Sequence, residues 1–443
     1  MKMLPILRQA KLWMAGAILV VGCDSSGSRQ GGSADVEPVA ADTTAVEVKA
    51  APIPSTDTAT PVASAGTFNS AVAFGVFQEE TFYGVSRIGA TPSEEPIRLP
   101  TKDPWWVQPW DLKAMAAVRE DFLAQKIPAI KLPAEAGDDE VRFLADIPTL
   151  KWLDLTSTQV TDEGLAALAN LTGLETLILA NTQVGDEGVA HLANLVGLKS
   201  LDITGTPVGD AGIAHLGKLK QLEKLFAWGT SITGKGLALI AEHRELVELN
   251  IGSDYINEKE VAPLANLVRL EDLELRPIPL TDAGLKHLAG LVEMRKLAFE
   301  GTEITDEGLT SLAGMTRLTT LIIDDAPLNG TGLRKLDKLT ELETLMLLDA
   351  EVIDEAVPAL TAFKNLDSLD LGRSSLTEAG LAHLTRLPKL KMLYIGYTEV
   401  SKFGLEHIEK MKLTHLEVSG KKLSEADRAA FRKSHDSYLE LLD

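Results

Sequence analysis

The sequence predicts an α/β protein built from stacked repeats, on three observations. From Leu150 onward, leucine returns every 24 residues in eleven copies without an insertion. Each copy joins a short run of alternating leucines, which is typical of a strand, to leucines at helical spacing. One strand and one helix cannot bury their apolar faces alone, so the copies must stack into a solenoid.

Columns of leucine and glycine define the repeat. The invariant column is Leu153, Leu177, Leu201, Leu225, Leu249, Leu273, Leu297, Leu321, Leu345, Leu369 and Leu393. Within the first full copy, the strand and then the helix are indicated by Leu153, Leu155, Leu165, Leu168 and Leu171. A third column holds glycine near the start of each expected helix, except at Glu260 and Ala356.

Polar residues mark where each helix begins. Ten of the eleven residues that precede the expected helices are Thr, Ser, Asn or Gly, which are N-cap types. Asp or Glu often follows in the first turn, where the helix dipole favours negative charge. Pro263 and Pro358 fall inside expected helices of the two repeats without glycine, so we expect irregular segments there.

The pattern "LxxLxLxxTxVTDxGLxxLxxL" resembles that of leucine-rich repeat proteins, close to the ribonuclease-inhibitor-like class, over residues 130–423. The resemblance implies a right-handed horseshoe, with a parallel sheet on the concave face and helices on the convex face. Many members place Asn or Cys after the strand, but here threonine recurs at Thr158, Thr182, Thr206, Thr230, Thr302 and Thr398. A hydroxyl provides part of the same backbone bonding. Binding residues differ between members, so none carries over.

The N-terminus predicts an exported, lipid-anchored protein. Residues 1–22 combine Lys2 and Arg8 with an apolar run, Leu12–Val21, that is too short to span a bilayer comfortably and is typical of a secretory signal. "VVGC", which ends at Cys23, resembles the bacterial lipobox, and Cys23 is the single cysteine. The alternative is an ordinary thiol. We therefore expect a membrane-anchored lipoprotein of the bacterial envelope, outside the cytoplasm.

Composition sets the remaining boundaries. Residues 23–66 are rich in Ser, Gly, Ala, Thr and Pro and lack aromatics, which indicates a flexible tether behind the lipidated cysteine. Residues 67–129 form an N-terminal region that concentrates aromatics and ends in an expected helix, Asp111–Ile127, over one end of the repeats. Residues 424–443 begin with capping-box spacing at Ser424 and predict a C-terminal cap helix.

Several chemistries are disfavoured. A net charge of -21 argues against nucleic acid as a partner. Gly229–Gly236 is one residue short of a phosphate-binding loop, because Gly236 stands where Ser or Thr would bind magnesium. Adjacent helices lie about 8–10 Å apart, which is too wide for one metal to join a column of histidines: His191, His215, His287, His383 and His407. We expect no catalytic residues, metal or cofactor.

The concave face is the candidate binding surface. Its outward positions are mostly polar, and two apolar groups interrupt them. The first group is Trp152, Ile178, Phe226 and Trp228, and the second is Ile322, Met346, Leu348, Met392 and Tyr394. Aromatic anchors dominate protein interfaces, so we expect these residues to bind a protein or peptide. The acids between them favour a basic or neutral partner: Glu248, Asp272, Glu274 and Glu300.

Other interpretations stay open. Residues 67–110 could cover the concave aromatics from within the chain, or the aromatics could be scattered surface hydrophobes without function. For the whole protein, we expect a monomeric binding scaffold. The alternative is a passive structural component of the envelope, which would need no apolar patch on its concave face.

Overall fold

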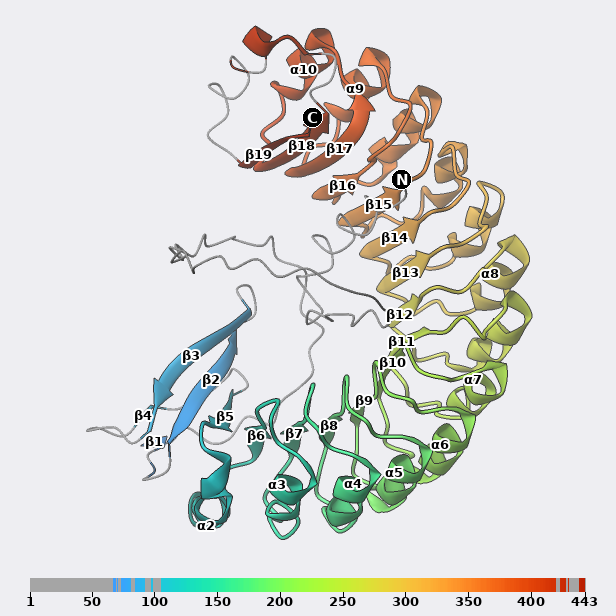
Figure 1. Cartoon of the computed structure of the whole chain (residues 1–443). Helices are drawn as coiled ribbons and strands as arrows, with labels where there is room; N and C mark the ends of the chain where they lie inside the picture. Colours follow the sequence, from blue (N-terminus) through green and yellow to red (C-terminus); the bar gives the residue numbers. More distant parts are fainter. Residues whose placement is uncertain are drawn as a thin grey trace, which may run out of the picture.

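The structure is a computed structural model that describes residues 67–68, 70, 73–80, 84–91, 97–98, 105–419, 423–427, 429 and 438–442. The expected signal peptide, Cys23 and the tether lie outside these residues. The described chain forms one curved sheet that lines the inside of an arc, with helices outside (Figure 1). This is the predicted α/β leucine-rich-repeat solenoid, with the parallel sheet on its concave face.

The sheet is built by pairing each strand with the strand of the next repeat. From β5 to β19 every pairing is parallel, whereas β2 pairs antiparallel with both β3 and β5. In spatial order the strands are β3 (Gly84–Ala90), β2 (Phe74–Glu80), β5 (Trp105–Pro109), β6 (Ala129–Lys131), β7 (Trp152–Asp154), β8 (Thr176–Ile178), β9 (Ser200–Asp202), β10 (Lys224–Trp228), β11 (Glu248–Gly252), β12 (Asp272–Leu275), β13 (Lys296–Glu300), β14 (Thr320–Asp324), β15 (Thr344–Leu348), β16 (Ser368–Asp370), β17 (Met392–Glu399), β18 (His415–Ser419) and β19 (Tyr438–Leu442). Separately, β1 (Thr67–Phe68) pairs with β4 (Ile97–Arg98).

The convex side carries α-helices in most repeats and 3₁₀ helices in the others. The α-helices are α2 (Met115–Gln125), α3 (Asp138–Arg142), α4 (Asp162–Leu168), α5 (Asp186–His191), α6 (Asp210–His215), α7 (Gly234–Ile240), α8 (Asp282–Leu288), α9 (Glu378–Leu384) and α10 (Lys402–Ile408). The 3₁₀ helices are η1 (Leu112–Ala114), η2 (Leu192–Asn194), η3 (Leu216–Lys218), η4 (Glu258–Asn266), η5 (Gly308–Leu312), η6 (Thr331–Leu336) and η7 (Asp354–Ala362). Among the helices of the described chain, none combines the length and apolar character that a membrane span requires.

Eight of the ten predicted caps are confirmed; the exceptions are Thr305 and Asn329, because η5 and η6 begin one or two residues later than expected, after Glu307 and Gly330. Six N-cap side chains accept a backbone N–H of the first turn: Thr161, Thr233, Asn257, Thr281, Thr377 and Ser401. The threonines after the strands also bond the backbone, as where the Thr158 hydroxyl donates to the Leu155 carbonyl at 2.7 Å. The Thr302 and Thr398 hydroxyls are buried without such a partner, so this role is not common to the whole column.

In most repeats, an aspartate at the start of the helix joins that repeat to the next one. Asp210 accepts hydrogen bonds from the backbone N–H of Thr233 at 2.8 Å and of Gly236 at 2.9 Å. Asp162 likewise accepts from the Gly185 N–H at 2.6 Å. The expected role of these acids in the helix dipole is therefore accompanied by a second one, which is to bond adjacent repeats together.

This contact explains the glycine column. A Cβ at Gly188 would lie 2.4 Å from the Asp162 Oδ1, closer than real contacts allow. Where glycine is missing, the preceding aspartate is missing too: Gly234 precedes Glu260. The Glu260 carboxylate fills the space beside Gly234 and accepts the Asn257 N–H at 2.9 Å, which replaces the lost aspartate contact. Ala356 and Gly330 form the second such pair, in which Gly330 has a φ of 84°.

The two prolines fall in irregular segments, as predicted. Pro263 lies in η4 and Pro358 in η7, and both segments are 3₁₀ rather than α-helical. The repeats that contain η5 and η6 are also 3₁₀, although neither helix contains proline. Proline is therefore one cause of irregularity in this array and not its sole cause.

The aromatic N-terminal region continues the sheet beyond the repeats. Its hairpin, β2 and β3, joins β5, and β5 then pairs in parallel with β6. Asp111 caps η1 by accepting the Lys113 N–H at 2.9 Å, which confirms the expected helix start. On the convex side, Phe122 of α2 packs against Phe74 with ring centroids 6.4 Å apart.

The C-terminal prediction was wrong in part. The Asp427 N–H donates to the Ser424 hydroxyl at 3.1 Å, so a helix begins there as expected. However, Tyr438–Leu442 forms strand β19, which pairs in parallel with β18 and places Leu439 opposite Leu416. The "YLELL" stretch alternates leucine at period two, and this alternation continues the repeat's strand column.

The contact between Asp162 and Gly188 predicts an unequal response of two glycines. Gly188→Ala should lower the free energy of unfolding by about 1–3 kcal/mol, because the added methyl group collides with a carboxylate that cannot move without losing its bonds. Gly217→Ala is the control, since a Cβ there meets nothing within 4 Å. Urea unfolding of both variants measures the difference, and equal stabilities would contradict this explanation of the glycine column.

Candidate functional site

The concave face consists of alternate side chains of the sheet. In β10, Leu225 and Ala227 point into the core, whereas Lys224, Phe226 and Trp228 lie on the open face. Phe226 is half-buried and Trp228 is 44% exposed, more than any other large concave hydrophobic residue that the structure describes. The aromatic pair that stood out in the sequence is therefore placed as predicted.

Trp228 rests on a glycine of the neighbouring strand. Gly252 is its partner in the parallel register of β10 and β11. A Cβ at Gly252 would lie 2.7 Å from the indole Cδ1 of Trp228 and would collide with the Arg276 carbonyl. Only a residue without a side chain permits both contacts, so Gly252 lets the indole pack on the backbone while the rest of the ring remains accessible.

Tyr255 is a further exposed aromatic residue, outside the strands, that sequence reasoning did not single out. It is 65% exposed and lies in the loop after β11, three residues beyond Gly252. Its position in the repeat is otherwise held by small, polar or proline residues such as Gln159, Ser231 and Pro279. An aromatic residue departs from the pattern of this column, which is the signal in the sequence that distinguishes Tyr255. Phe226, Trp228 and Tyr255 are called the aromatic group below.

Ion pairs occupy the concave acids beside the aromatic group. Glu248 pairs with Lys224 at 3.0 Å, and Glu274 pairs with Arg276 at 3.1 Å. Lys296 contacts Glu274 at 2.5 Å and Asp272 at 3.6 Å. The expected attraction for a basic partner is therefore weaker than a count of acids suggests, because these acids already have basic neighbours within the sheet.

Asp272 has the most perturbed of these carboxyl groups. Its pKa is raised to about 7: burial is the largest cause, Lys296 opposes it, and the nearby Glu248 and Glu274 add to it. The pKa of Glu274 is lowered instead: burial raises it, but Lys296 and Arg276 together outweigh that effect. Lys296 is thus committed mainly to Glu274, and Asp272 holds its proton near neutral pH.

The second apolar group lies on the C-terminal part of the concave face. Ile322 and Met346 are neighbours in register on β14 and β15 and are half-buried, whereas Leu348 is 9% exposed. Met392 and Tyr394 of β17 are half-buried, and the Tyr394 hydroxyl lies 4.0 Å from the Met392 sulfur. No side chain of this group is as exposed as Trp228.

The structure places two predicted binding residues in a cluster inside the fold. Trp152 is 6% exposed and packs on Trp106 with centroids 5.4 Å apart, and Phe77 stacks on Trp106 at 6.1 Å. Ile178 packs against the same cluster. The N-terminal region therefore packs on Trp152, as one open interpretation held, and Trp152 and Ile178 belong to this cluster rather than to an open concave surface.

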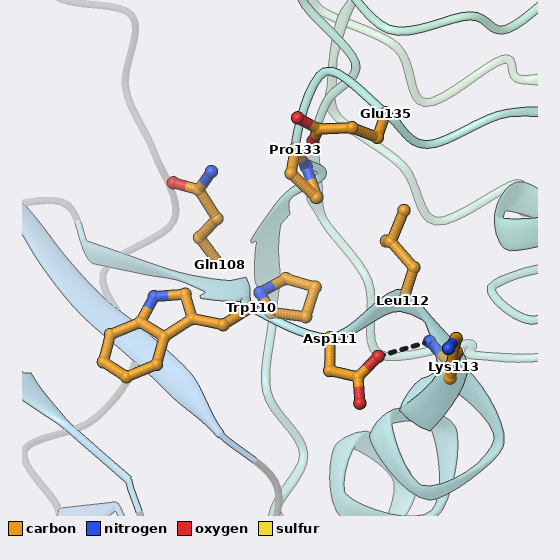
Figure 2. A pocket seen from close by; sticks show the side chains of 8 residues that line it. Gln108, Trp110, Asp111, Leu112, Lys113, Pro133 and Glu135 are labelled. Carbon is orange, nitrogen blue, oxygen red and sulfur yellow. Dashed lines mark hydrogen bonds between the residues drawn. The ribbon is translucent and has the colours of Figure 1, made fainter.

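Two further features are accounted for by the fold. In the Gly229–Gly236 segment, the Gly236 N–H and the Thr233 hydroxyl donate to Asp210, so groups that could bind phosphate are already used. Figure 2 shows a pocket at the N-terminal end, lined by Gln108, Pro109, Trp110, Asp111, Leu112, Lys113, Pro133 and Glu135. Of its two carboxylates, Asp111 and Glu135, Asp111 serves as a helix cap. In the described part of the chain, no group of three or more His, Cys, Asp or Glu side chains could hold a metal ion.

The raised pKa of Asp272 predicts a dependence of stability on pH. Its folded-state pKa of about 7 exceeds the ordinary value of 3.8, so the folded protein binds this proton more tightly than the unfolded chain does. The contribution of Asp272 to stability should therefore be largest below pH 4 and lost as pH rises through 7. The free energy of unfolding of Asp272→Asn, relative to that of the wild type, should therefore increase by at least about 1 kcal/mol between pH 5 and pH 8, measured by urea unfolding. A constant difference across that range would contradict the assignment.

Comparison with known proteins gives results that agree with the fold. A family model described as a leucine-rich repeat region matches residues 183–421, and a second leucine-rich repeat model matches residues 147–169 and 171–193. Comparison with curated proteins returned no match. Among solved structures, an internalin (InlF) from Listeria monocytogenes matches with a TM-score of 0.52 and 22% identity, over 65% of this chain and 77% of its own.

Two other solved structures are more distant. The ectodomain of the receptor kinase GASSHO1/SCHENGEN3 from Arabidopsis thaliana, in complex with CASPARIAN STRIP INTEGRITY FACTOR 2, has a TM-score of 0.44 and 16% identity, over 76% of this chain and 48% of its own. A leucine-rich repeat protein of Leptospira interrogans has a TM-score of 0.42 and 17% identity, over 68% of this chain and 92% of its own. Because the first family model covers more than half of the 443 residues, the chain belongs to the leucine-rich repeat family.

Proposed function

We propose that this protein is a membrane-anchored binding scaffold, which holds a protein or peptide segment on its concave face. The observation that carries the proposal is the exposed indole of Trp228, seated on Gly252 in the middle of a regular sheet. Large aromatic side chains held in a fixed orientation are the usual anchors of protein interfaces. Scaffolds of this repeat family typically serve protein–protein interaction, and nothing in the site suggests catalysis.

The spacing of the apolar groups suits an extended segment. Five strand steps separate Phe226 on β10 from Met346 on β15. At ~4.8 Å per step this is about 24 Å, or roughly seven residues of extended chain. The proposed segment crosses the strands and reaches both groups, Phe226, Trp228 and Tyr255 at one end and Ile322, Met346, Leu348, Met392 and Tyr394 at the other. The proposed segment is basic or neutral in charge. The scaffold that binds it acts as a monomer.

The proposed anchor is a lipid on Cys23. The support lies in the sequence: an apolar stretch ends in "VVGC", and a segment without aromatics follows as far as residue 66. Several acyl chains on one cysteine would hold the protein to a membrane more stably than a single chain can. The scaffold would then face away from the cytoplasm, in the bacterial envelope.

The alternative is a passive structural component of the envelope. A spacer needs a regular array, and the aspartate contacts and leucine columns of this chain supply one. It does not need an exposed indole, which costs solubility and favours non-specific association. The aromatic group therefore favours the binding scaffold.

Removal of the aromatic pair should abolish capture of the partner. Full-length protein, cross-linked in envelope extracts, should capture a species that the Phe226→Ala, Trp228→Ala double variant does not. With the purified species, the double variant should bind at least about thirtyfold more weakly, or ~2 kcal/mol. The control is Val268→Ala with Val292→Ala, which removes exposed apolar side chains outside the sheet.

Three outcomes separate the interpretations. Loss of the species in the double variant alone supports the scaffold. Identical capture by all three proteins contradicts it and favours the passive component. A melting temperature that falls by many degrees in the double variant means that the aromatics hold the chain's own fold.

The anchor has its own test. Mass spectrometry of protein extracted from membranes should show a mature chain that begins with a lipidated Cys23. Cys23→Ser should leave the protein unanchored, because no other cysteine can accept the lipid. A mature chain that begins elsewhere, or unchanged membrane fractionation of the variant, would count against lipidation.

A further inference from the structure

The concave face also indicates what kind of segment it takes. We propose that the bound segment carries a basic side chain three to four residues from an apolar one, and that the basic group binds at Asp272 while the apolar group sits on Phe226 and Trp228. This inference rests on the proposed function and refines it, because it assigns a partner chemistry to a position beside the aromatic group.

The register places two carboxylates side by side. Lys224, Glu248, Asp272 and Lys296 follow one another on β10 to β13 as direct cross-strand neighbours. Like charges that lie directly opposite each other destabilise a sheet. The charge of Glu248 is balanced by Lys224, whose ammonium lies 3.0 Å away. Asp272 instead shares Lys296 with Glu274, and Lys296 lies farther from Asp272 (3.6 Å) than from Glu274 (2.5 Å). Asp272 is therefore the carboxylate that gains most from another cation.

Charge balance on this face agrees. The concave positions of β10 to β14 carry five carboxylates against three basic groups: Glu248, Asp272, Glu274, Glu300 and Asp324 against Lys224, Arg276 and Lys296. The Asp272 side chain keeps 19% exposure, so a group that arrives from the concave side can reach it. A basic side chain there would replace the proton that this carboxyl group otherwise retains near neutral pH.

An unsatisfied acceptor lies between the two subsites. Asn250 is the neighbour of Phe226 in register, and its amide nitrogen donates to Glu274 at 2.7 Å. Its Oδ1 is buried and accepts no hydrogen bond within the described structure. A buried acceptor without a donor is costly. A rotation of the Asn250 side chain that turns Oδ1 toward the concave face would let an N–H group of a bound segment satisfy it. This observation is independent of the charges and points to the same place.

The distance fixes the spacing within the segment. Asp272 lies two strands from Phe226 and two residues nearer the start of its strand. With ~4.8 Å per strand and ~3.3 Å per residue, the two positions are about 12 Å apart, or roughly three to four residues of extended chain. The distance between the two subsites is the same whichever way the segment runs. The test therefore includes peptides with the basic residue before the apolar one and peptides with the reverse order.

Defined peptides test the proposal. The probes are fluorescein-labelled alanine–serine peptides that contain Phe and Lys separated by one to six positions in both orders, each with a Gln-for-Lys counterpart. Fluorescence polarisation with the full-length protein should show at least tenfold preference for Lys over Gln, greatest at a spacing of three to four. The preference should grow from pH 6 to pH 8 as Asp272 loses its proton beside Glu248, Glu274 and Lys296.

Matched variants separate this proposal from the proposed function. Asp272→Asn should abolish both the Lys preference and its pH dependence while Gln peptides bind as before. Glu175→Gln is the control, because Glu175 also pairs with two lysines, Lys151 and Lys199, but outside the concave face. Phe226→Ala with Trp228→Ala should weaken Lys and Gln peptides alike.

Each other outcome counts against one proposal. If Lys and Gln peptides bind equally and both need Phe226 and Trp228, the basic subsite is wrong and the scaffold stands. If peptide binding ignores the aromatic pair, the scaffold site itself is wrong. Absence of binding by every peptide, or a Lys preference that survives Asp272→Asn, overturns the subsite.

Discussion

The contact between an aspartate and the next repeat's backbone is the constraint on which the rest of the molecule depends. A carboxylate such as Asp210 accepts N–H groups from the following helix start, where backbone donors would otherwise lack partners. Because this bond recurs with the repeat, it sets the distance and register between neighbours. The leucine columns supply the burial, but leucine packing has no direction, whereas this hydrogen bond does. Glycine 26 residues later is its steric consequence. Where Gly234 replaces the aspartate, the acceptor moves: Glu260 accepts the Asn257 N–H from within the same repeat.

A fixed register is what made the concave face predictable. Without insertions, a residue's place in the 24-residue pattern determines both its strand and its side of the sheet. The leucine core, most of the caps and the exposure of Trp228 could therefore be predicted from spacing alone. The aspartate contact could have been predicted as well, since the two glycine exceptions, Glu260 and Ala356, follow the two repeats in which glycine replaces the acidic residue.

Features outside the repeat could not be predicted in this way. Trp152 is covered by Trp106 and Phe77, which come from a segment with no period, so only the structure reveals their meeting. At the other end, β19 follows the strand pattern, although the chain between β18 and β19 does not keep the 24-residue spacing. On the sheet itself, the pairing of Lys296 with Glu274 in preference to Asp272 depends on side-chain geometry, which a column of letters does not contain.

Folding and function can be separated at the aromatic group. The same position of the repeat holds Thr204 in the preceding repeat and Thr156 two repeats before that, and the array is regular there. Trp228 is therefore not required to complete a repeat, and as an exposed indole it contributes less burial than a core residue would. Gly252 opposite it also loses backbone entropy on folding that a side-chain residue would not. The pair is explained if selection acts on what the indole contacts, since a platform held against the backbone binds a second surface without first losing its own freedom.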